Sequence, residues 1–140
     1  MSTGLAVFDT TVQETNLWLK QLMEQMRTED RQAAYLALRA TLHVLRDRLG
    51  PENAIHLGAQ LPLLLRGVYY EGWHIGPPSR ERQPGDFIEH VRAELPRAAT
   101  LDAHLAARSA LAVLQERLDP GEVAKIKRIL PHQLHALWPA

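Results

Sequence analysis

"RLGPENAIHLGAQLPLLLRGVY" spans residues 48–69, and "RLDPGEVAKIKRILPHQLHALW" spans residues 117–138. Both stretches read R-L-x-P, continue with apolar residues every three or four positions, and reach L-P before a short apolar segment that an aromatic residue closes. The apolar spacing is that of one face of an α-helix, and each proline is typical of a helix boundary. The two stretches therefore predict an internal repeat built from helices.

The similarity between the two copies extends upstream of these stretches. At an offset of 69 residues, twelve positions are identical without a gap: Ala34/Ala103, Ala37/Ala106, Arg39/Arg108, Leu42/Leu111, Val44/Val113, Leu45/Leu114, Arg48/Arg117, Leu49/Leu118, Pro51/Pro120, Leu61/Leu130, Pro62/Pro131 and Leu65/Leu134. "FDTTV" near the start also echoes "FIEHV" at an offset of 79, which predicts a longer path between the first two helices of the first copy. We predict repeats at approximately 8–71 and 86–138, joined by a connection at 72–85.

Apolar periodicity predicts helices throughout and no strand. Long helices are expected at 8–27, 29–49, 86–95 and 100–118, and shorter ones begin at Pro51, Leu63, Pro120 and Pro131. The inward stripe of the first helix is predicted to be Val12, Leu19, Leu22, Met23 and Met26; that of the second is predicted to be Ala34, Leu38, Thr41, Leu42, Leu45 and Leu49. The expected N-caps are Asp9 or Thr10, Thr28, Asp86 and Asp119, the last in a capping box with Glu122.

The expected architecture is all-α. We predict a single domain over residues 1–140, a compact bundle of about seven or eight helices built from two related four-helix repeats. Because each repeat is too small to bury its own apolar face, the two are expected to share one core, with a pseudo-two-fold arrangement.

Composition narrows the classes of function. The chain has 140 residues, of which 16 are basic and 16 acidic, so no global field attracts nucleic acid or an anionic membrane. The absence of cysteine excludes disulfides and thiolate chemistry. The longest apolar run is too short to span a bilayer, and the N-terminal residues do not resemble a signal peptide. These features predict a soluble cytoplasmic protein that binds no membrane. They disfavour nucleic acid as a partner, which would require the basic residues to converge on one face.

Four stretches carry a resemblance to a known family: "TNLWLKQL", "DRQAAYLALRATLHVLRDRL", "AIHLGAQLPLLLRGVYYEGW" and "FIEHVRAEL". They resemble the bacterial DUF2267 family, a domain of unknown function, and "LGAQLPLLLRGVYYEGW" is the most specific part. The resemblance covers nearly the whole chain. It implies a compact all-helical protein with two related halves, and it brings no established activity, substrate or cofactor.

The densest cluster of functional side chains follows the first copy's last helix. The candidate binding residues for a partner or ligand are Arg66, Tyr69, Tyr70, Glu71, Trp73 and His74, together with Arg39, which matches Arg108 in the second copy. In one interpretation Tyr69 and Trp73 close the end of the core and Gly72 ends the helix. In the other, this strip forms an aromatic pocket or a docking surface to which Arg66 and Glu71 supply polar contacts.

Catalytic and metal-binding patterns are weak. Glu71 and His74 have the E-x-x-H spacing of di-iron bundles, but the chain lacks the second such motif that this site needs. His132 and His135 would need a further ligand to hold zinc. No serine lies in a nucleophile motif, and no glycine-rich phosphate loop is present. We therefore predict no catalytic residues, no metal and no cofactor.

The leading functional hypothesis is a non-catalytic helical module for protein interaction, or a stress-related accessory protein, which docks an unknown protein partner or self-associates. The alternative is a small-molecule binder or an undescribed enzyme, with a pocket between the two repeats near Tyr70, Trp73 and Arg39. The environment of Trp73 separates them. An enclosed cavity would favour a ligand, and a flat exposed patch would favour a protein partner.

Overall fold

The computed structural model describes residues 2–76 and 84–139. Within these ranges the chain forms seven α-helices, one 3₁₀ helix and no strand, so the all-α prediction is confirmed. The elements are α1 (Ala6–Met26), α2 (Arg31–Leu49), α3 (Pro51–Ala59), α4 (Leu63–Tyr70), α5 (Pro84–Glu94), α6 (Ala103–Arg117), α7 (Pro120–Ile129) and η1 (His132–Leu137). Of the connection expected at 72–85, residues 77–83 lie outside the described residues, and residues 84 and 85 already belong to α5.

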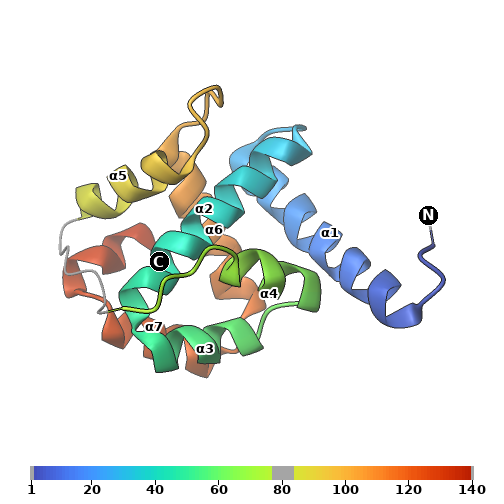
Figure 1. The fold of residues 1–140 in the computed structure, drawn as a ribbon. Coiled ribbons are helices and arrows are strands. Elements are labelled where there is room, and N and C mark those ends of the chain that lie inside the picture. The colour runs from blue at the N-terminus through green and yellow to red at the C-terminus, as the bar shows by residue number, and fades with distance from the viewer. Residues whose placement is uncertain (1, 77–83, 140) are drawn as a thin grey trace.

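The core forms around α2 and α6, which pack directly on one another (Figure 1). Both helices present buried alanines, and because alanine side chains are small, the two helix axes can approach closely. These alanines are Ala34, Ala37, Ala40, Ala103, Ala106, Ala107 and Ala110. The stripe predicted for α2, from Ala34 to Leu49, is buried at every position.

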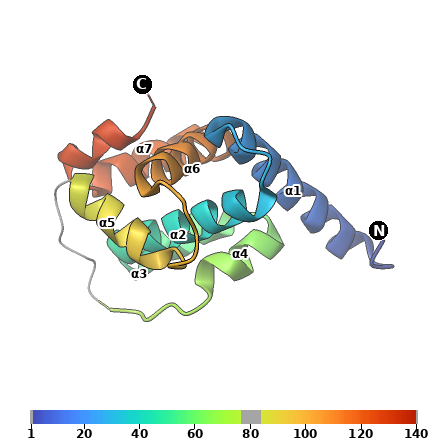
Figure 2. The ribbon, with the colours of Figure 1, turned by 90° about the horizontal axis from the view of Figure 1, so that it is seen from above.

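The other helices are arranged around this central pair. Figure 2 shows α6 and α7 on one side of the molecule and α2, α3 and α4 on the other, with α1 and α5 at opposite ends. Both end helices pack across the central pair, since α1 and α5 each contact α2 and α6. Every helix therefore buries one apolar face, and buried side chains from all seven α-helices and η1 form one core.

α1 is longer than the body against which it packs. Its later residues Trp18, Leu22 and Met26 are buried, but Val12 is 38% exposed and Phe8 is 48% exposed. The prediction that Val12 faces the core is therefore wrong. Figure 1 shows that the start of α1 projects beyond the other helices. Near Val12, α4 covers the helix at Thr11, which is buried and accepts from the N–H of Leu64, but Val12 itself stays exposed.

The start of α1 also differs from the prediction. The helix begins at Ala6, with Leu5 in the N-cap position and no side-chain cap, so neither Asp9 nor Thr10 is the cap. Asp9 lies in the first turn and accepts hydrogen bonds from the backbone N–H of Thr3 at 2.7 Å and from its hydroxyl at 2.9 Å. These bonds lower the pKa of Asp9. The carboxylate thus holds the preceding residues against the helix.

The predicted caps of α2 and α5 are wrong, and that of α7 is right in position only. α2 is capped by Asp30, whose carboxylate accepts from the N–H of Ala33 at 3.2 Å, and Thr28 instead accepts from the N–H of Asp30. α5 begins two residues before Asp86, which lies in its first turn. Asp119 occupies the N-cap position of α7 without a side-chain bond, and Glu122 pairs with Lys125 rather than completing a capping box.

The predicted boundary between α2 and α3 is confirmed. Gly50 ends α2 with a φ of 79°, in the region that favours glycine, and Pro51 begins α3 where no backbone donor is needed.

Two aspartates that precede helices differ in capping and allow a direct test. Asp102 accepts hydrogen bonds from the N–H groups of His104 and Leu105, whereas Asp119 caps nothing with its side chain. We expect Asp102→Ala to lower the free energy of unfolding by about 1 kcal/mol, because the first N–H groups of α6 lose their acceptor. Asp119→Ala is the matched control, with a clearly smaller expected loss. Urea unfolding followed by circular dichroism measures both, and equal losses would contradict this assignment.

Candidate functional site

The end of α4 is held by two buried side chains of α2. The last carbonyls of a helix have no partner within the helix. The Nη1 atom of Arg46 donates to the carbonyl of Tyr69 at 2.7 Å and to that of Glu71 at 3.2 Å. The Nε2–H of His43 donates to the carbonyl of Val68 at 2.7 Å. Side chains of α2 therefore supply donors to the C-terminal carbonyls of α4.

Arg39 completes this contact at the surface. Its guanidinium lies 3.1 Å from the carboxylate of Glu71, whose side chain is 69% exposed. An ion pair this exposed contributes little to stability. Because Arg39, His43 and Arg46 follow at intervals of four and three residues, they lie on one face of α2. We call these three residues, with the α4 terminus they hold, the α2–α4 clasp.

The charge of Arg46 is compensated where it is buried. The residue is 5% exposed, and its Nε donates to the carboxylate of Asp47 at 3.0 Å. The carbonyls at the C-terminal end of α4 add the negative end of the helix dipole. The guanidinium also lies 6.0 Å from the ring centroid of Trp73, within range of a cation–π contact. Sequence analysis did not identify Arg46 as a candidate. Its position next to Leu45 of the predicted inward stripe could have indicated that it is buried.

His43 is neutral in this environment. Burial lowers its pKa below the ordinary value near 6.5, and the nearby cations Arg46 and Arg39 lower it further. The carbonyl of Val68 and the carboxylate of Glu94, whose oxygen is 3.7 Å from Nδ1, act in the opposite direction. The imidazole therefore serves as an uncharged donor to the α4 terminus.

The aromatic strip divides between core and surface. Tyr69 is fully buried, and its hydroxyl donates to the carbonyl of Ala54 at 2.7 Å, while burial raises its pKa. Tyr70 meets the edge of the Tyr69 ring at 4.9 Å and stacks on Trp73 at 5.7 Å. Tyr70 and Trp73 are half-buried and pack against the core. Tyr69 therefore stabilises the core, and the other two rings cover it.

Arg66 has a similar structural role one helix earlier. Its Nε donates to the carbonyl of Gly58 at 3.0 Å, and its terminal nitrogen donates to the carbonyls of Leu61 and Ala59 at 3.1 and 3.3 Å. These carbonyls lie at and just beyond the end of α3. The guanidinium is thus committed to closing α3.

Trp73 lines a depression of about 350 Å³ beside the clasp. The other lining side chains include Arg46, Asp47, His74 and Glu94, so the walls are mainly polar. Tyr70 and Arg39 are not among the lining residues, and the expected grouping of Tyr70, Trp73 and Arg39 around one pocket does not form here. One half-exposed ring in an open, polar depression is neither the enclosed cavity nor the flat patch considered from the sequence.

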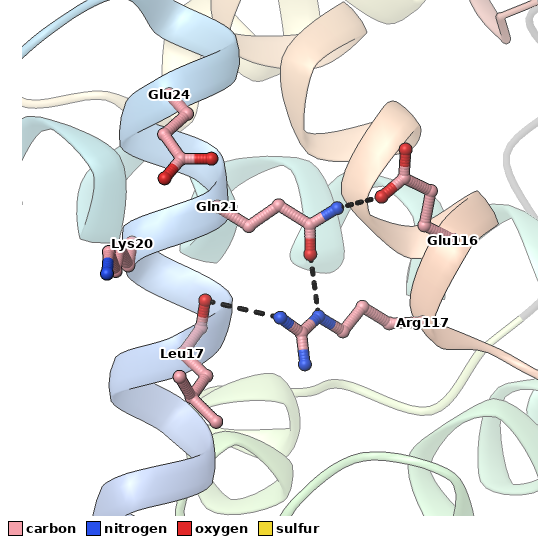
Figure 3. Close-up of a pocket in the computed structure, with 6 residues that line it drawn as sticks. All are labelled: Leu17, Lys20, Gln21, Glu24, Glu116 and Arg117. Atoms are coloured by element: carbon pink, nitrogen blue, oxygen red, sulfur yellow. Dashed lines mark hydrogen bonds between the residues drawn. The ribbon is translucent and has the colours of Figure 1, made fainter.

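Two depressions of about 690 and 360 Å³ lie along α1, and Leu17 and Arg117 line both of them. The larger one is a groove between α1 and α6. Gln21 bridges its walls, because its amide N–H donates to Glu116 and its amide oxygen accepts from Nε of Arg117 at 2.7 Å (Figure 3). Sequence analysis did not find this groove, although Arg117 belongs to the repeated R-L-x-P motif.

The histidines and carboxylates do not converge. Among the residues that the structure describes, no group of three or more histidine, aspartate or glutamate side chains could hold a metal ion. The rings of His132 and His135 lie 4.8 Å apart, and His135 is engaged with the backbone carbonyl of Lys127. Over residues 2–76 and 84–139, no helix is both long and apolar enough to cross a membrane.

The fold and its polar contacts define a small all-helical domain in which side chains of α2 hold the end of α4. The chain belongs to the family described as "Uncharacterized conserved protein (DUF2267)", whose family model matches residues 15–137. The resemblance seen in the sequence is thereby confirmed. Among curated proteins, none matches the chain.

The close approach of α3 and α4 depends on a glycine. A Cβ built at Gly58 would lie 2.2 Å from the hydroxyl oxygen of Tyr70. We expect Gly58→Ala to lower the free energy of unfolding by about 1–3 kcal/mol, because the Tyr70 ring must leave its stack on Trp73. In a Tyr70→Ala background the same change should cost clearly less, and any remaining loss comes from Tyr69, whose Cε2 would lie 3.1 Å from the new Cβ. A double-mutant cycle by chemical unfolding measures this coupling, and additive effects would contradict it.

Stability should also depend on the protonation of His43. Its folded-state pKa is lowered, so below about pH 6.5 the unfolded chain binds more protons, and the free energy of unfolding falls as the pH falls. We expect His43→Gln, which retains a donor for Val68, to reduce this slope between roughly pH 7 and pH 5. Urea unfolding at several pH values checks it. His104→Gln, at an exposed position, is the control, and an equal change in slope would refute the assignment.

Proposed function

We propose that this protein is a helical interaction module that binds a protein partner through the projecting start of α1. The observation that carries this proposal is the exposure of large apolar side chains there. Val7 is 58% exposed and Phe8 is 48% exposed, although both lie on an amphipathic helix of the core. We call residues 6–14 the α1 overhang.

The first turn of α4 adds to the same end of the molecule. The backbone N–H of Leu64 donates to the hydroxyl of Thr11 at 2.8 Å, which joins the two helices. Leu63 and Leu64 are 50% and 45% exposed. The overhang surface therefore consists of Leu5, Val7, Phe8, Val12, Leu63 and Leu64. A group of exposed large apolar side chains of this kind is typical of protein interaction sites.

The overhang continues the face of α1 that packs on the core. Phe8, Thr11, Thr15, Trp18 and Leu22 follow one another at helical intervals of three or four residues. The last four of these residues are buried, whereas Phe8 is not. The overhang thus presents core-type residues with no described helix to cover Phe8, which supports a partner in that place.

We also propose that the two halves are copies of one four-helix unit. Three further residue pairs at the offset of 69 share their burial: Trp18 with Phe87, Leu22 with Val91, and Met26 with Leu95. Arg48 and Arg117, which occupy the same position in the two halves, make equivalent contacts. Arg117 on α6 bonds to Gln21 of α1, and Arg48 on α2 lies 2.8 Å from the equivalent His90 of α5. These contacts support an exchange of first helices between the halves.

The overhang lies outside this repeated unit. At the offset of 69, the first residue of α5, Pro84, corresponds to Thr15, which is also the first residue that the family model matches. Phe8, which aligns with the buried Phe87 only at the offset of 79, is exposed instead. Leu63 and Leu64 correspond to His132 and Gln133, which are polar and exposed. Residues 6–14 thus precede the stretch that the family model matches, and Leu63 and Leu64 have no apolar counterparts in the second half, so the apolar end is not repeated within the chain.

A double variant tests the proposal. We expect Val7→Ser/Phe8→Ser to lose the partner when tagged protein is captured from the cells in which it naturally occurs and its companions are quantified by mass spectrometry. The free energy of unfolding should change by less than about 1 kcal/mol, because both side chains are largely exposed.

The matched control is Leu105→Ser/Ile129→Ser, which removes two exposed apolar residues elsewhere on the surface. This control should retain the partner. The proposal fails if the overhang variant and the control retain the same set of proteins at the same abundance.

A further inference from the structure

The exposed apolar face at the start of α1 is free of charged side chains. Phe8 and Val12 lie one turn apart on the same side of α1, and Leu5, at the N-cap position, precedes Phe8 by three residues. The charged residues of the overhang are Asp9 and Glu14. A helix turns by about 100° per residue, so these two lie roughly 100–120° from Phe8, one on either side. Charge therefore borders this face and does not interrupt it.

The first turn of α4 extends the face. Val7 lies one turn before Thr11, whose hydroxyl accepts from the N–H of Leu64 at 2.8 Å, so Val7 lies on the side of α1 that meets α4. Leu63 and Leu64 are each about half exposed. Arg66 is the single charged residue of α4, and its guanidinium donates to three carbonyls at the end of α3. The α4 part of the surface is therefore apolar, and the one charge of this helix is directed towards α3.

The overhang surface is large enough for a contact between two proteins. Its six residues are between 38% and 58% exposed. Because a fully exposed apolar residue of this size presents on the order of 150–250 Å², the six together present on the order of 500 Å². Two such surfaces in contact would bury about 1,000 Å², which approaches the roughly 1,200 Å² at which specific interfaces begin. A contact of this size predicts a dimer of moderate affinity.

This surface occurs once among the described residues. In the second half, His132 and Gln133 take the places of Leu63 and Leu64, and α5 begins at the residue equivalent to Thr15. A contact between the surface of one copy and a different region of the next would leave one of each open and produce chains of molecules. A contact of the surface with itself, about a two-fold axis, satisfies both copies and closes at two.

We propose that the protein partner of the overhang is a second copy of this chain, and that the two overhang surfaces pack on one another about a two-fold axis. This inference rests on the proposed function and names its partner. In a two-fold contact each side chain meets its own surroundings on the other copy. A charge-free face tolerates this, because no like charges are brought together. The chain also has a net charge of zero, so two copies do not repel at longer range.

The projection of α1 sets the direction of this packing. Each overhang extends beyond its own molecule (Figure 1), so an antiparallel arrangement of the two helices keeps the two bodies apart. With Phe8 near the axis, Leu5 of one copy lies opposite Val12 of the other. The end of each overhang then reaches towards Leu63 and Leu64 of the other copy, and the apolar residues of α1 and α4 are covered together.

Sedimentation equilibrium of the full chain tests the partner. We expect a monomer–dimer equilibrium with a dissociation constant in the micromolar range, because the apolar area is modest. Val7→Ser/Phe8→Ser should raise this constant at least about tenfold, since both side chains lose their apolar contact. Leu105→Ser/Ile129→Ser should leave it within about twofold, and circular dichroism confirms that both variants fold. A chain that stays monomeric at roughly 500 µM, or an equal effect of both variants, would overturn the proposal.

Single cysteines test the two-fold geometry. The chain has no cysteine, so one introduced thiol is the only one present. A residue near a two-fold axis meets its own copy, and a disulfide then forms if the two Cα atoms lie within about 7 Å. At least one of Leu5→Cys, Phe8→Cys and Val12→Cys should form linked dimers about tenfold faster than Leu105→Cys and Ile129→Cys under mild oxidation. Equal rates for all five variants would overturn the two-fold contact.

Salt distinguishes this contact from one that ion pairs hold together. Between low and moderate salt the dissociation constant should not rise, because screening weakens charge pairs and leaves apolar contacts intact. A dimer that dissociates as salt is added would overturn the apolar contact.

The two proposals fail separately. Captured from its natural cells, the tagged chain should carry its own untagged copy, and Val7→Ser/Phe8→Ser should lose it. If the pure chain stays monomeric while this variant loses a different protein, the interaction module stands and the second copy is wrong.

Discussion

The contact between α2 and α6 is the constraint on which the rest of the structure depends. The alanines that line both helices allow a close approach, and the pair then lies in the middle of the molecule. A helix in this position has neighbours on most sides, so even the polar residues of α2 become buried. Every other helix packs around this pair and takes its place from the faces that the pair leaves free.

The position of α2 explains why the conspicuous aromatic strip is mostly structural. Because Arg46 and His43 are buried, they need acceptors, and the last carbonyls of α4 need donors. Arg46 and His43 donate to these carbonyls, and this fixes the end of α4 beside the buried Tyr69. The surface that we propose as a binding site lies instead at the start of α1, where large apolar side chains are exposed.

Much of the fold followed from the spacing of apolar residues, and the exceptions have physical reasons. Periodicity placed the α2 stripe correctly because both sides of that helix are covered along its whole length. It misplaced Val12, since a pattern of side chains indicates which face is apolar but not where the neighbouring helix ends. Thr28 and Asp30 are both favourable N-cap residues by type. Only the path of the chain before α2 determines that Asp30 reaches the N–H of Ala33.

The sequence by itself determined the helical class, the family, and the helix boundary at Gly50 and Pro51, because these depend on local spacing and on the backbone preferences of single residues. The tertiary structure decided which charged side chains bind another residue and which do not. The binding of Arg117 to Gln21 is a contact between distant segments. Such groups meet only when α1 packs on α6, because electrostatic interactions depend on distance in space and not on distance along the chain.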